Sequence, residues 1–368
     1  MGFPHDSVLP QGSLILVTGV TGFLAGIITD QLLQHGFRVR GTVRDPENNK
    51  ASWMPTHFEK RYGKGTFEMV QVKDMEREGC FDAAVRGCSG VIHVASVTAF
   101  STDPHKIINP SITFVQNILA AAENEPSVSR FVLTSSSAAA SQDRVNEAYD
   151  LTPDMWANWA IEEAWASTPH TEQKARANYY ASKALSEQRM WKYVEERNPR
   201  FVVNSVLPDF VIGLAVKPEQ QGFASSMALF KQMFENSGDA WRSFGPQWCV
   251  DAYDVALLHI AGLVCPHAKN ERIFAYAHRK TWTEFIRRLQ ESYPNHQFPG
   301  VYTNVSQSGF PGDYLLIPTS EPDSHEGQDL SNVTGRERAE GLLRWMGSSG
   351  WKPLGESLKE VSDYILLN

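Results

Sequence analysis

The sequence predicts an α/β fold in which helices cover both faces of a doubly wound parallel sheet. Over the first half of the chain, short runs of apolar and β-branched residues alternate with longer helical stretches. The runs are apolar almost throughout, which is typical of parallel strands buried on both faces. A glycine turn joins the first run to the first helix, as in sheets that bind nucleotides.

Each predicted strand is a short apolar run bounded by Gly, Pro or polar residues. In chain order the strands are Leu14–Thr18, Val39–Val43, Phe67–Val72, Val91–Ala95, Phe131–Thr134 and Phe201–Leu207. The helices between them have apolar residues at helical spacing or are rich in alanine. The clearest of these helices cover about Leu24–Gln34, Ile112–Glu123 and Tyr180–Glu196.

Beyond Gly213 this rhythm changes, and Pro, Gly and Trp are scattered among helical segments such as Ser225–Asn236 and Thr281–Ser292. We therefore predict a first domain over residues 1–212 and a smaller, interleaved C-terminal substrate lobe over residues 213–368. The apolar helix Asp254–Leu263 is assigned back to the first domain, with a returning segment of about 246–268.

One stretch of the second half is rich in Pro, Gly, Ser and acidic residues, from Gly309 to Gln328. Such a composition contributes little to a core and is typical of surface loops. We predict a mobile loop over about 301–328, with residues 310–322 as a flexible cover over the substrate.

The composition excludes several classes of function. The net charge of −8 argues against a surface for nucleic acid or for an anionic membrane. No apolar run approaches the ~18 residues that span a bilayer. The cysteines Cys80, Cys88, Cys249 and Cys265 form no CxxC pair and no zinc spacing, so we expect reduced thiols, no metal site and a cytoplasmic protein.

The glycine turn after the first strand is the first candidate binding site. Gly19 permits a tight turn, and Gly22 lets a pyrophosphate approach the N–H groups at the start of the helix. Ala25 occupies the position of a third glycine, so the spacing is GxxGxxA. In this Rossmann-type arrangement we expect the cofactor to contact Gly19, Thr21, Gly22, Phe23 and Leu24.

The residues after the second strand bear on the choice of cofactor. Asp45 stands where an acid binds the ribose 2′-OH of NAD. Arg44 can instead neutralise the 2′-phosphate of NADP, with Lys50 as a second cation. Spacing alone does not separate the two cofactors.

The segment Tyr179–Lys183 contains a YxxxK pattern. Residues four apart share one face of a helix, so Tyr179 and Lys183 project together. Tyr180, three residues before Lys183, would also approach the lysine, but the YxxxK pattern selects Tyr179. A lysine ammonium and an oxidised nicotinamide near a phenol favour the phenolate and lower the phenol pKa, which makes the tyrosine a usable acid–base group.

A third candidate lies at the end of the fifth strand, in Thr134-Ser135-Ser136-Ser137. Hydroxyl groups at the carboxyl ends of parallel strands stand in the crevice where ligands bind. A serine there can donate to a carbonyl oxygen as negative charge develops on it. A glycine turn, a serine at strand five and a later YxxxK occur together rarely by accident.

These motifs resemble the extended short-chain dehydrogenase/reductases, in the group of plant dihydroflavonol reductases and yeast-type NADPH-dependent aldehyde and methylglyoxal reductases. The resemblance extends from about residue 8 to near the C-terminus. It is carried by Val8–Pro10, Gly12–Leu14, Val17–Gly19, Gln31–Leu33, Val39–Thr42, Arg130–Ser136, Tyr179–Lys183, Val206–Pro208 and Gly327–Ser331.

The resemblance implies a role for several residues. It makes Ser136, Tyr179 and Lys183 the catalytic triad and Arg44 the ligand of the 2′-phosphate, which favours NADP(H). The remaining cofactor contacts that it implies are Lys50, Asp74, Met75, Ala95, Tyr179, Lys183 and Pro208. One departure concerns the helix that carries Asn117: relatives often have Gly-Thr where this chain has Phe114-Val115, and that bulk can shift the helix against the nucleotide.

Together these observations predict an NADPH-dependent reductase that converts an aldehyde or ketone to an alcohol, acting as a monomer or homodimer on an apolar or aromatic small molecule. The apolar series Phe223, Met227, Phe230, Met233, Phe234 and Trp241 suggests such a substrate, although part of it is helix core. Two alternatives are oxidation of a hydroxysteroid or another alcohol by the same groups, and a non-catalytic NADP-sensing regulator.

Overall fold

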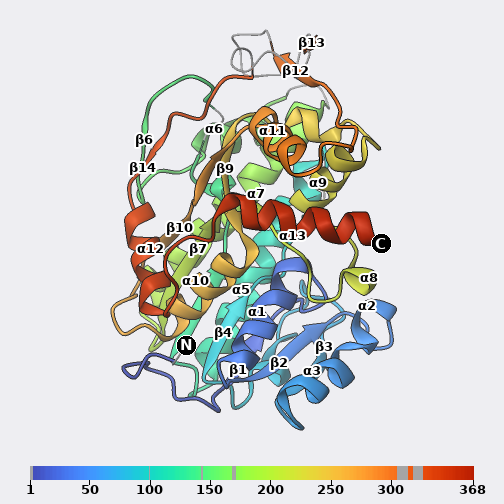
Figure 1. Ribbon diagram of the computed structural model, residues 1–368. Coiled ribbons are helices and arrows are strands. Elements are labelled where there is room, and N and C mark those ends of the chain that lie inside the picture. Colours follow the sequence, from blue (N-terminus) through green and yellow to red (C-terminus); the bar gives the residue numbers. More distant parts are fainter. Residues whose placement is uncertain (1–2, 99, 142–143, 168–170, 305–313, 318–325) are drawn as a thin grey trace.

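The computed structural model describes residues 3–98, 100–141, 144–167, 171–304, 314–317 and 326–368. Its centre is a seven-stranded parallel sheet with the strand order β10-β7-β5-β4-β1-β2-β3 (Figure 1). The strands are β1 (Leu14–Val17), β2 (Arg38–Val43), β3 (Phe67–Gln71), β4 (Gly90–His93), β5 (Arg130–Thr134), β7 (Val202–Pro208) and β10 (Arg272–Ala275). This large sheet confirms the predicted α/β class.

All of the predicted strands belong to the large sheet, but the sequence analysis missed β10. Its four residues, Arg-Ile-Phe-Ala, are too few to show a period, and its partner β7 is distant in sequence. The main sheet therefore takes residues from beyond the predicted returning segment 246–268. The division of the chain into two lobes stays a prediction.

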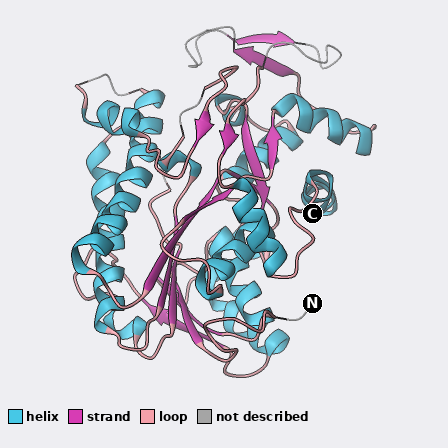
Figure 2. Cartoon of the chain, turned by 90° about the vertical axis from the view of Figure 1, so that its left-hand side faces the viewer, coloured by secondary structure: helices cyan, strands magenta, loops and turns pink. Residues whose placement is uncertain are grey.

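Helices cover both faces of the large sheet, as the edge-on view in Figure 2 shows. One face packs against α1 (Phe23–Gln34), α10 (Ala252–Val264) and α12 (Arg336–Trp345). The other packs against α5 (Ile108–Asn124) and α7 (Glu172–Arg197). The apolar helix around Asp254 thus packs on the large sheet, beside α1.

Helix α7 is longer than predicted and begins well before Tyr180. Thr171 caps its N-terminus by accepting a hydrogen bond from the Lys174 backbone N–H at 3.2 Å. At the other end Asn198 takes the left-handed conformation, with φ of 44°. Tyr179 and Lys183 consequently lie inside a continuous helix, whose backbone fixes their spacing.

A second, three-stranded sheet has the order β11-β9-β8, and we call it the small sheet. Its strands are β8 (Phe210–Ile212), β9 (Gln247–Asp251) and β11 (His278–Lys280). It shares a core with α9 (Ser226–Glu235), α11 (Trp282–Ser292) and α13 (Leu354–Leu367). Because β8 follows β7 almost directly, the small sheet begins where the carboxyl end of the large sheet stops.

The predicted mobile loop of 301–328 is wrong for part of its length. Strand β12 (Val301–Asn304) pairs antiparallel with β13 (Tyr314–Ile317), because Tyr-Leu-Leu-Ile is an apolar run with strand propensity. The hairpin lies at the top of Figure 1. Residues 305–313 and 318–325, which carry most of the predicted cover, lie outside the described residues.

The remaining elements are short. They are α2 (Asn49–Ser52), α3 (Met54–Tyr62), α4 (Asp82–Val85), α6 (Asn158–Trp165), α8 (Pro218–Gln221), β6 (Asp150–Leu151) and β14 (Asn332–Val333), with 3₁₀ turns at Pro104–Lys106, Ser137–Ala139 and Ala240–Ser243. The pair β6–β14 is parallel and joins segments from the middle and the end of the chain. It places the segment after β13 beside the connection that follows β5.

Candidate active site

The glycine turn between β1 and α1 is built as a close-fitting bend. Gly19 has a positive φ of 68°, and a Cβ atom there would lie 3.1 Å from the Cβ of Ala95. The Thr18 hydroxyl oxygen accepts hydrogen bonds from the N–H groups of Val94 and Ala95, both at 3.0 Å. The ends of β1 and β4 are thereby tied together, and Ala95, which the resemblance makes a cofactor contact, borders the turn.

The N-terminus of α1 fits a dinucleotide pyrophosphate. Gly22 caps the helix without a side-chain hydrogen bond, and the first turn carries no acidic residue. The first-turn N–H groups and the positive end of the helix dipole are therefore available to an anion. Thr21, Phe23 and Leu24 line this turn and are half-buried.

Gln221 also belongs to this turn, and the sequence analysis missed it. Its Nε2 donates to the carbonyl oxygen of Gly22 at 3.1 Å. A Cβ atom on Gly26 would lie 2.8 Å from this Nε2 atom of Gln221. The glycine at position 26 therefore makes room for a side chain from α8, a contact that spans about half of the chain.

The predicted adenosine-side residues lie after β2 and β3. Arg44 and Lys50 are exposed. Asp45 is engaged locally, since its Oδ1 accepts from the Glu47 backbone N–H at 3.1 Å. Asp74 likewise accepts from the Glu76 N–H at 2.9 Å.

Met75 is fixed by α5, because its carbonyl oxygen accepts from Asn117 Nδ2 at 2.8 Å. On the same helix Phe114 and Val115 are buried, and Val115 belongs to the core between α5 and the sheet. The bulk noted in the sequence thus packs inward beside an asparagine that still reaches the β3 loop.

The structure brings Ser136, Tyr179 and Lys183 together at the carboxyl ends of the strands. Ser136 follows β5, and its hydroxyl is near enough to Tyr179 to lower the pKa of the phenol against the effect of burial. Lys183 is buried one helical turn beyond Tyr179. Pro208, the last residue of β7, is also buried at this edge. The predicted triad is therefore one local arrangement.

The neighbouring tyrosine points elsewhere. The centroid of the Tyr180 ring lies 5.4 Å from the centroid of the Trp159 ring. It lies 5.7 Å from the guanidinium carbon of Arg176. The Tyr180 ring also lies 6.4 Å from the ring of Tyr179, so the two tyrosines are in contact but differ in their further partners. The choice of Tyr179 as the acid–base group stays a prediction.

Burial sets the pKa shifts of the pair when the protein's own groups act alone. Burial raises the pKa of Tyr179, and the Ser136 hydroxyl opposes that rise without cancelling it. Burial also lowers the pKa of Lys183 to about 8, against the attraction of Glu187. The lowered phenol pKa that we expected includes the effect of an oxidised nicotinamide and stays a prediction.

Aromatic rings border the exposed side of Tyr179. The ring of Phe100 lies 5.3 Å from that of Tyr179 and 6.4 Å from that of Phe244. By contrast, most of the apolar series named in the sequence is fully buried helix core, namely Met227, Phe230, Met233, Phe234 and Trp241. The aromatic surface beside the triad therefore comes from residues that the sequence analysis did not single out.

Within the described part of the chain, no set of three His, Cys, Asp or Glu side chains is grouped so that it could hold a metal ion. The same residues include no helix with the length and apolarity needed to cross a membrane. All four cysteines are free.

The fold and this strand-end site define a nucleotide-dependent enzyme class. A family model described as the NAD dependent epimerase/dehydratase family matches residues 15–228, and the chain belongs to that family. One relative is the NAD-dependent epimerase/dehydratase terH of Aspergillus terreus, 36% identical over 97% of this chain and 98% of its own. Another is aldehyde reductase 2 of Sporidiobolus salmonicolor, 34% identical over 97% of each chain.

Among solved structures, the chain is similar to yeast methylglyoxal/isovaleraldehyde reductase Gre2 complexed with NADPH. The TM-score is 0.74 at 21% identity, over 96% of this chain and 98% of that one. At that identity the likeness establishes the fold. The resemblance to yeast-type reductases that the motifs indicated is confirmed, and reductase relatives support an oxidoreductase.

Proposed function

We propose that the protein reduces an aldehyde or ketone to an alcohol with NADPH. The observation that carries the proposal is the grouping of Ser136 at the end of β5 with Tyr179, whose phenol pKa the serine hydroxyl lowers, and with the buried Lys183 one turn away. These are the groups that a carbonyl reduction needs: a donor for the oxygen, a source of its proton and a cation that supports the phenolate left behind.

The cofactor, when bound, supplies the hydride. The pyrophosphate would lie against the N-terminus of α1, while Arg44 and Lys50 would face the 2′-phosphate and Lys183 the nicotinamide ribose. Ser136 holds the carbonyl oxygen, and Tyr179 gives it the proton. The raised pKa of Tyr179 suits this direction, because the phenol keeps its proton at neutral pH.

The same grouping bears on the alternatives. Alcohol oxidation, including that of a hydroxysteroid, would use the same three groups in reverse and stays the second candidate. A non-catalytic NADP-sensing regulator has no need of a serine and a tyrosine grouped beside a buried lysine. Phe100 and Phe244 support an apolar or aromatic substrate.

Turnover with NADPH against aromatic aldehydes, β-ketoesters and α-diketones tests the proposal. Tyr179→Phe should lower kcat by ~10²-fold or more, because it removes the proton donor and leaves the fold intact. Tyr180→Phe is the matched control and should be far milder. Equal losses in the two variants, or no turnover of any carbonyl by the unaltered protein, would overturn the assignment.

The choice of cofactor has its own test. NADPH should bind more tightly than NADH by about 1–3 kcal/mol, because Arg44 can pair with the 2′-phosphate. Arg44→Ala should remove most of that difference in a fluorescence titration. Equal affinity for both cofactors in the unaltered protein would make Asp45 the selector instead.

A further inference from the structure

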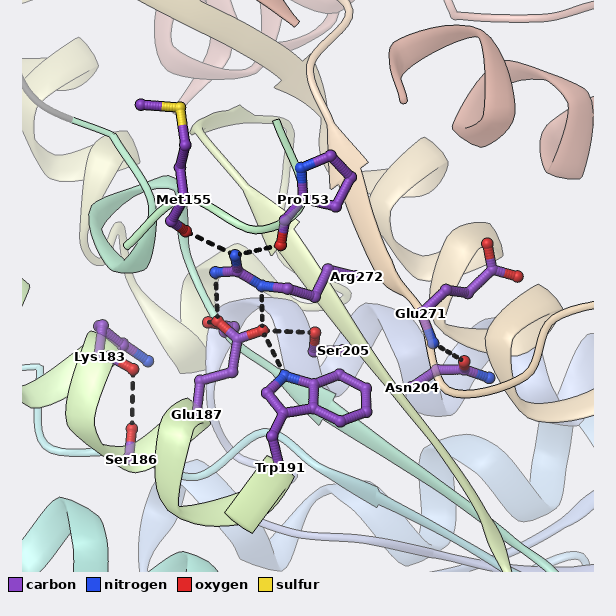
Figure 3. Close-up of polar contacts among 11 residues, drawn as sticks. Pro153, Met155, Lys183, Ser186, Glu187, Trp191, Asn204, Ser205, Glu271 and Arg272 are labelled. Carbon is purple, nitrogen blue, oxygen red and sulfur yellow. Dashed lines mark hydrogen bonds and ion pairs between the residues drawn. The ribbon is translucent and has the colours of Figure 1, made fainter. Parts of the chain in front are cut away.

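Glu187 is a fully buried carboxylate on α7, one helical turn beyond Lys183 (Figure 3). It accepts hydrogen bonds from the hydroxyl groups of Ser135 at 2.7 Å and Ser205 at 2.6 Å. The indole N–H of Trp191 also donates to it at 3.3 Å. Ser135 directly follows β5 and Ser205 lies in the middle of β7, so the carboxylate joins the helix to two strands.

Arg272 of β10 completes the coordination of Glu187. Its Nε donates to Oε1 at 2.8 Å and its Nη2 to Oε2 at 3.1 Å, which is a bidentate pair. Its Nη1 donates to the carbonyl oxygens of Pro153 and Met155 at 2.8 and 2.7 Å. The Trp156 ring centroid lies 3.8 Å from the guanidinium carbon. Both charges are therefore buried with well-formed partners.

This ion pair lies beside the proposed active site. Ser135, which Glu187 holds, directly precedes Ser136. Lys183 and Glu187 are four residues apart on one face of α7, and Figure 3 shows them on successive turns. One carboxylate thus connects the strand end that carries Ser136 with the helix turn that carries Lys183.

The charged and titratable groups around Lys183 come from three elements. On α7 they are Tyr179 and Glu187, and on β10 Arg272 lies behind Glu187. On β4, His93 is fully buried, its Nδ1 lies 2.9 Å from the Thr18 hydroxyl, and burial lowers its pKa to about 3, so it is neutral. Glu187 is the group that raises the pKa of Lys183 against burial.

We propose that Glu187 and Arg272 act as a positioning pair for the reaction, in which Glu187 fixes the Lys183 turn of α7 relative to Ser136 and Arg272 fixes Glu187. The pair does not touch the reacting atoms. The proposal rests on the proposed function only for the roles of Ser136, Tyr179 and Lys183.

The test follows the titration of Lys183 itself, by NMR of the protein labelled with ¹³C at lysine Cε and assigned with Lys183→Arg. Glu187→Gln removes the negative charge and should move the Lys183 titration to lower pH by on the order of one unit. Arg272→Met leaves that charge unneutralised and should move it to higher pH by a similar amount.

The opposite signs separate this role from a purely structural one, since both variants weaken the fold in the same way. Glu271→Gln, at the neighbouring position, breaks the surface pair with Arg338 and should leave the titration in place. Arg272→Lys keeps the charge and is the variant expected to fold if the others do not; it should leave the titration near its original pH and lower kcat through lost geometry.

In turnover, the pH at which kcat/KM falls on the alkaline side should follow the Lys183 titration from variant to variant. Unchanged titrations, or shifts of the same sign in Glu187→Gln and Arg272→Met, would overturn the proposal. A pair that shifts Lys183 as expected in a protein that reduces no carbonyl would instead overturn the proposed function alone.

Discussion

Two buried charges in this molecule are stabilised in different ways. Glu187, at the large sheet, receives hydrogen bonds from Ser135, Ser205 and Arg272. Lys280, at the end of β11 in the small sheet, is just as buried, but its Nζ has no hydrogen-bond partner among the described residues. Glu187 is therefore stabilised by hydrogen bonds, and Lys280 by contacts with aromatic rings.

The surroundings of Lys280 are aromatic. Its Nζ lies 3.6 Å from the centroid of the Trp282 ring, 4.7 Å from that of Phe210 and 5.6 Å from that of Phe285. Burial lowers the pKa of Lys280 to about 8, while Glu326 opposes that shift through charge attraction. Cation–π contacts offset part of the cost of desolvation but replace no hydrogen bond.

This difference in hydrogen bonding indicates which of the two charges stabilises the fold. Removing one member of a fully bonded buried pair leaves the other charge, and its hydrogen-bond donors or acceptors, without partners. Removing a buried ammonium that has no hydrogen-bond partner among the described residues leaves none of their donors or acceptors newly unsatisfied. The two sites should therefore respond to an apolar substitution with opposite signs.

The largest effect is expected from Arg272→Met. Glu187 would stay buried beside only neutral donors, and the carbonyl groups of Pro153 and Met155 would lose their donor. The free energy of unfolding in urea should fall by about 3–5 kcal/mol. Glu271→Gln, which breaks the surface pair with Arg338, should cost under about 1 kcal/mol. Similar losses in the two variants would remove the distinction between the buried and the surface pair.

Lys280→Met should have the opposite sign. Methionine keeps the length of the side chain and its packing against the rings without burying a charge. At pH 7 the free energy of unfolding should rise by about 1–2 kcal/mol, the cost implied by the pKa shift less the lost cation–π contacts. Lys60→Met on the exposed face of α3 is the control and should stay within about 0.5 kcal/mol. If Lys280→Met clearly destabilised the protein, the ammonium would be shown to stabilise the fold, and this expectation would be wrong.

The same variant should show a pH dependence. Because the folded-state pKa of Lys280 lies near 8 and below its unfolded value, the unfolded chain binds more protons between about pH 8 and 10. The free energy of unfolding of the unaltered protein should therefore rise relative to that of Lys280→Met as the pH increases through this range. Parallel stability curves from pH 7 to 10 would contradict the buried, shifted lysine.

The smallest effect is expected from Trp156→Leu. This change removes the ring that stacks on Arg272 but leaves every hydrogen bond of the ion pair in place. The loss should be about 1 kcal/mol by thermal or urea unfolding. A loss as large as that of Arg272→Met would show that stacking, rather than the hydrogen bonds, holds the pair.

Local patterns predicted the parts of this structure that depend on neighbours in sequence. The spacing of Tyr179 and Lys183 is a property of one helix, and Gly19 is a property of one turn. For the same reason, the four-residue spacing of Lys183 and Glu187 already places both residues on one face of α7.

The missed features depend on contacts between distant segments. Arg272 lies on a strand of four residues that becomes recognisable only when it pairs with β7. Gln221 reaches the glycine turn from the far half of the chain. The direction of the Tyr179 pKa shift depends on how much apolar material surrounds the phenol, which no spacing within α7 reveals.

The position of β10 at one edge of the large sheet has a consequence for biosynthesis. When β7 leaves the ribosome, the strand that will cover its outer edge is still about 60 residues from being made. At typical rates of synthesis that gap lasts roughly 3–12 s, during which β7 presents an open edge and Glu187 has no arginine. The nascent chain therefore passes through a stage in which strands of other molecules can compete for β7. When β10 arrives, it covers that edge of the sheet and brings Arg272 to the buried carboxylate of Glu187 in the same step.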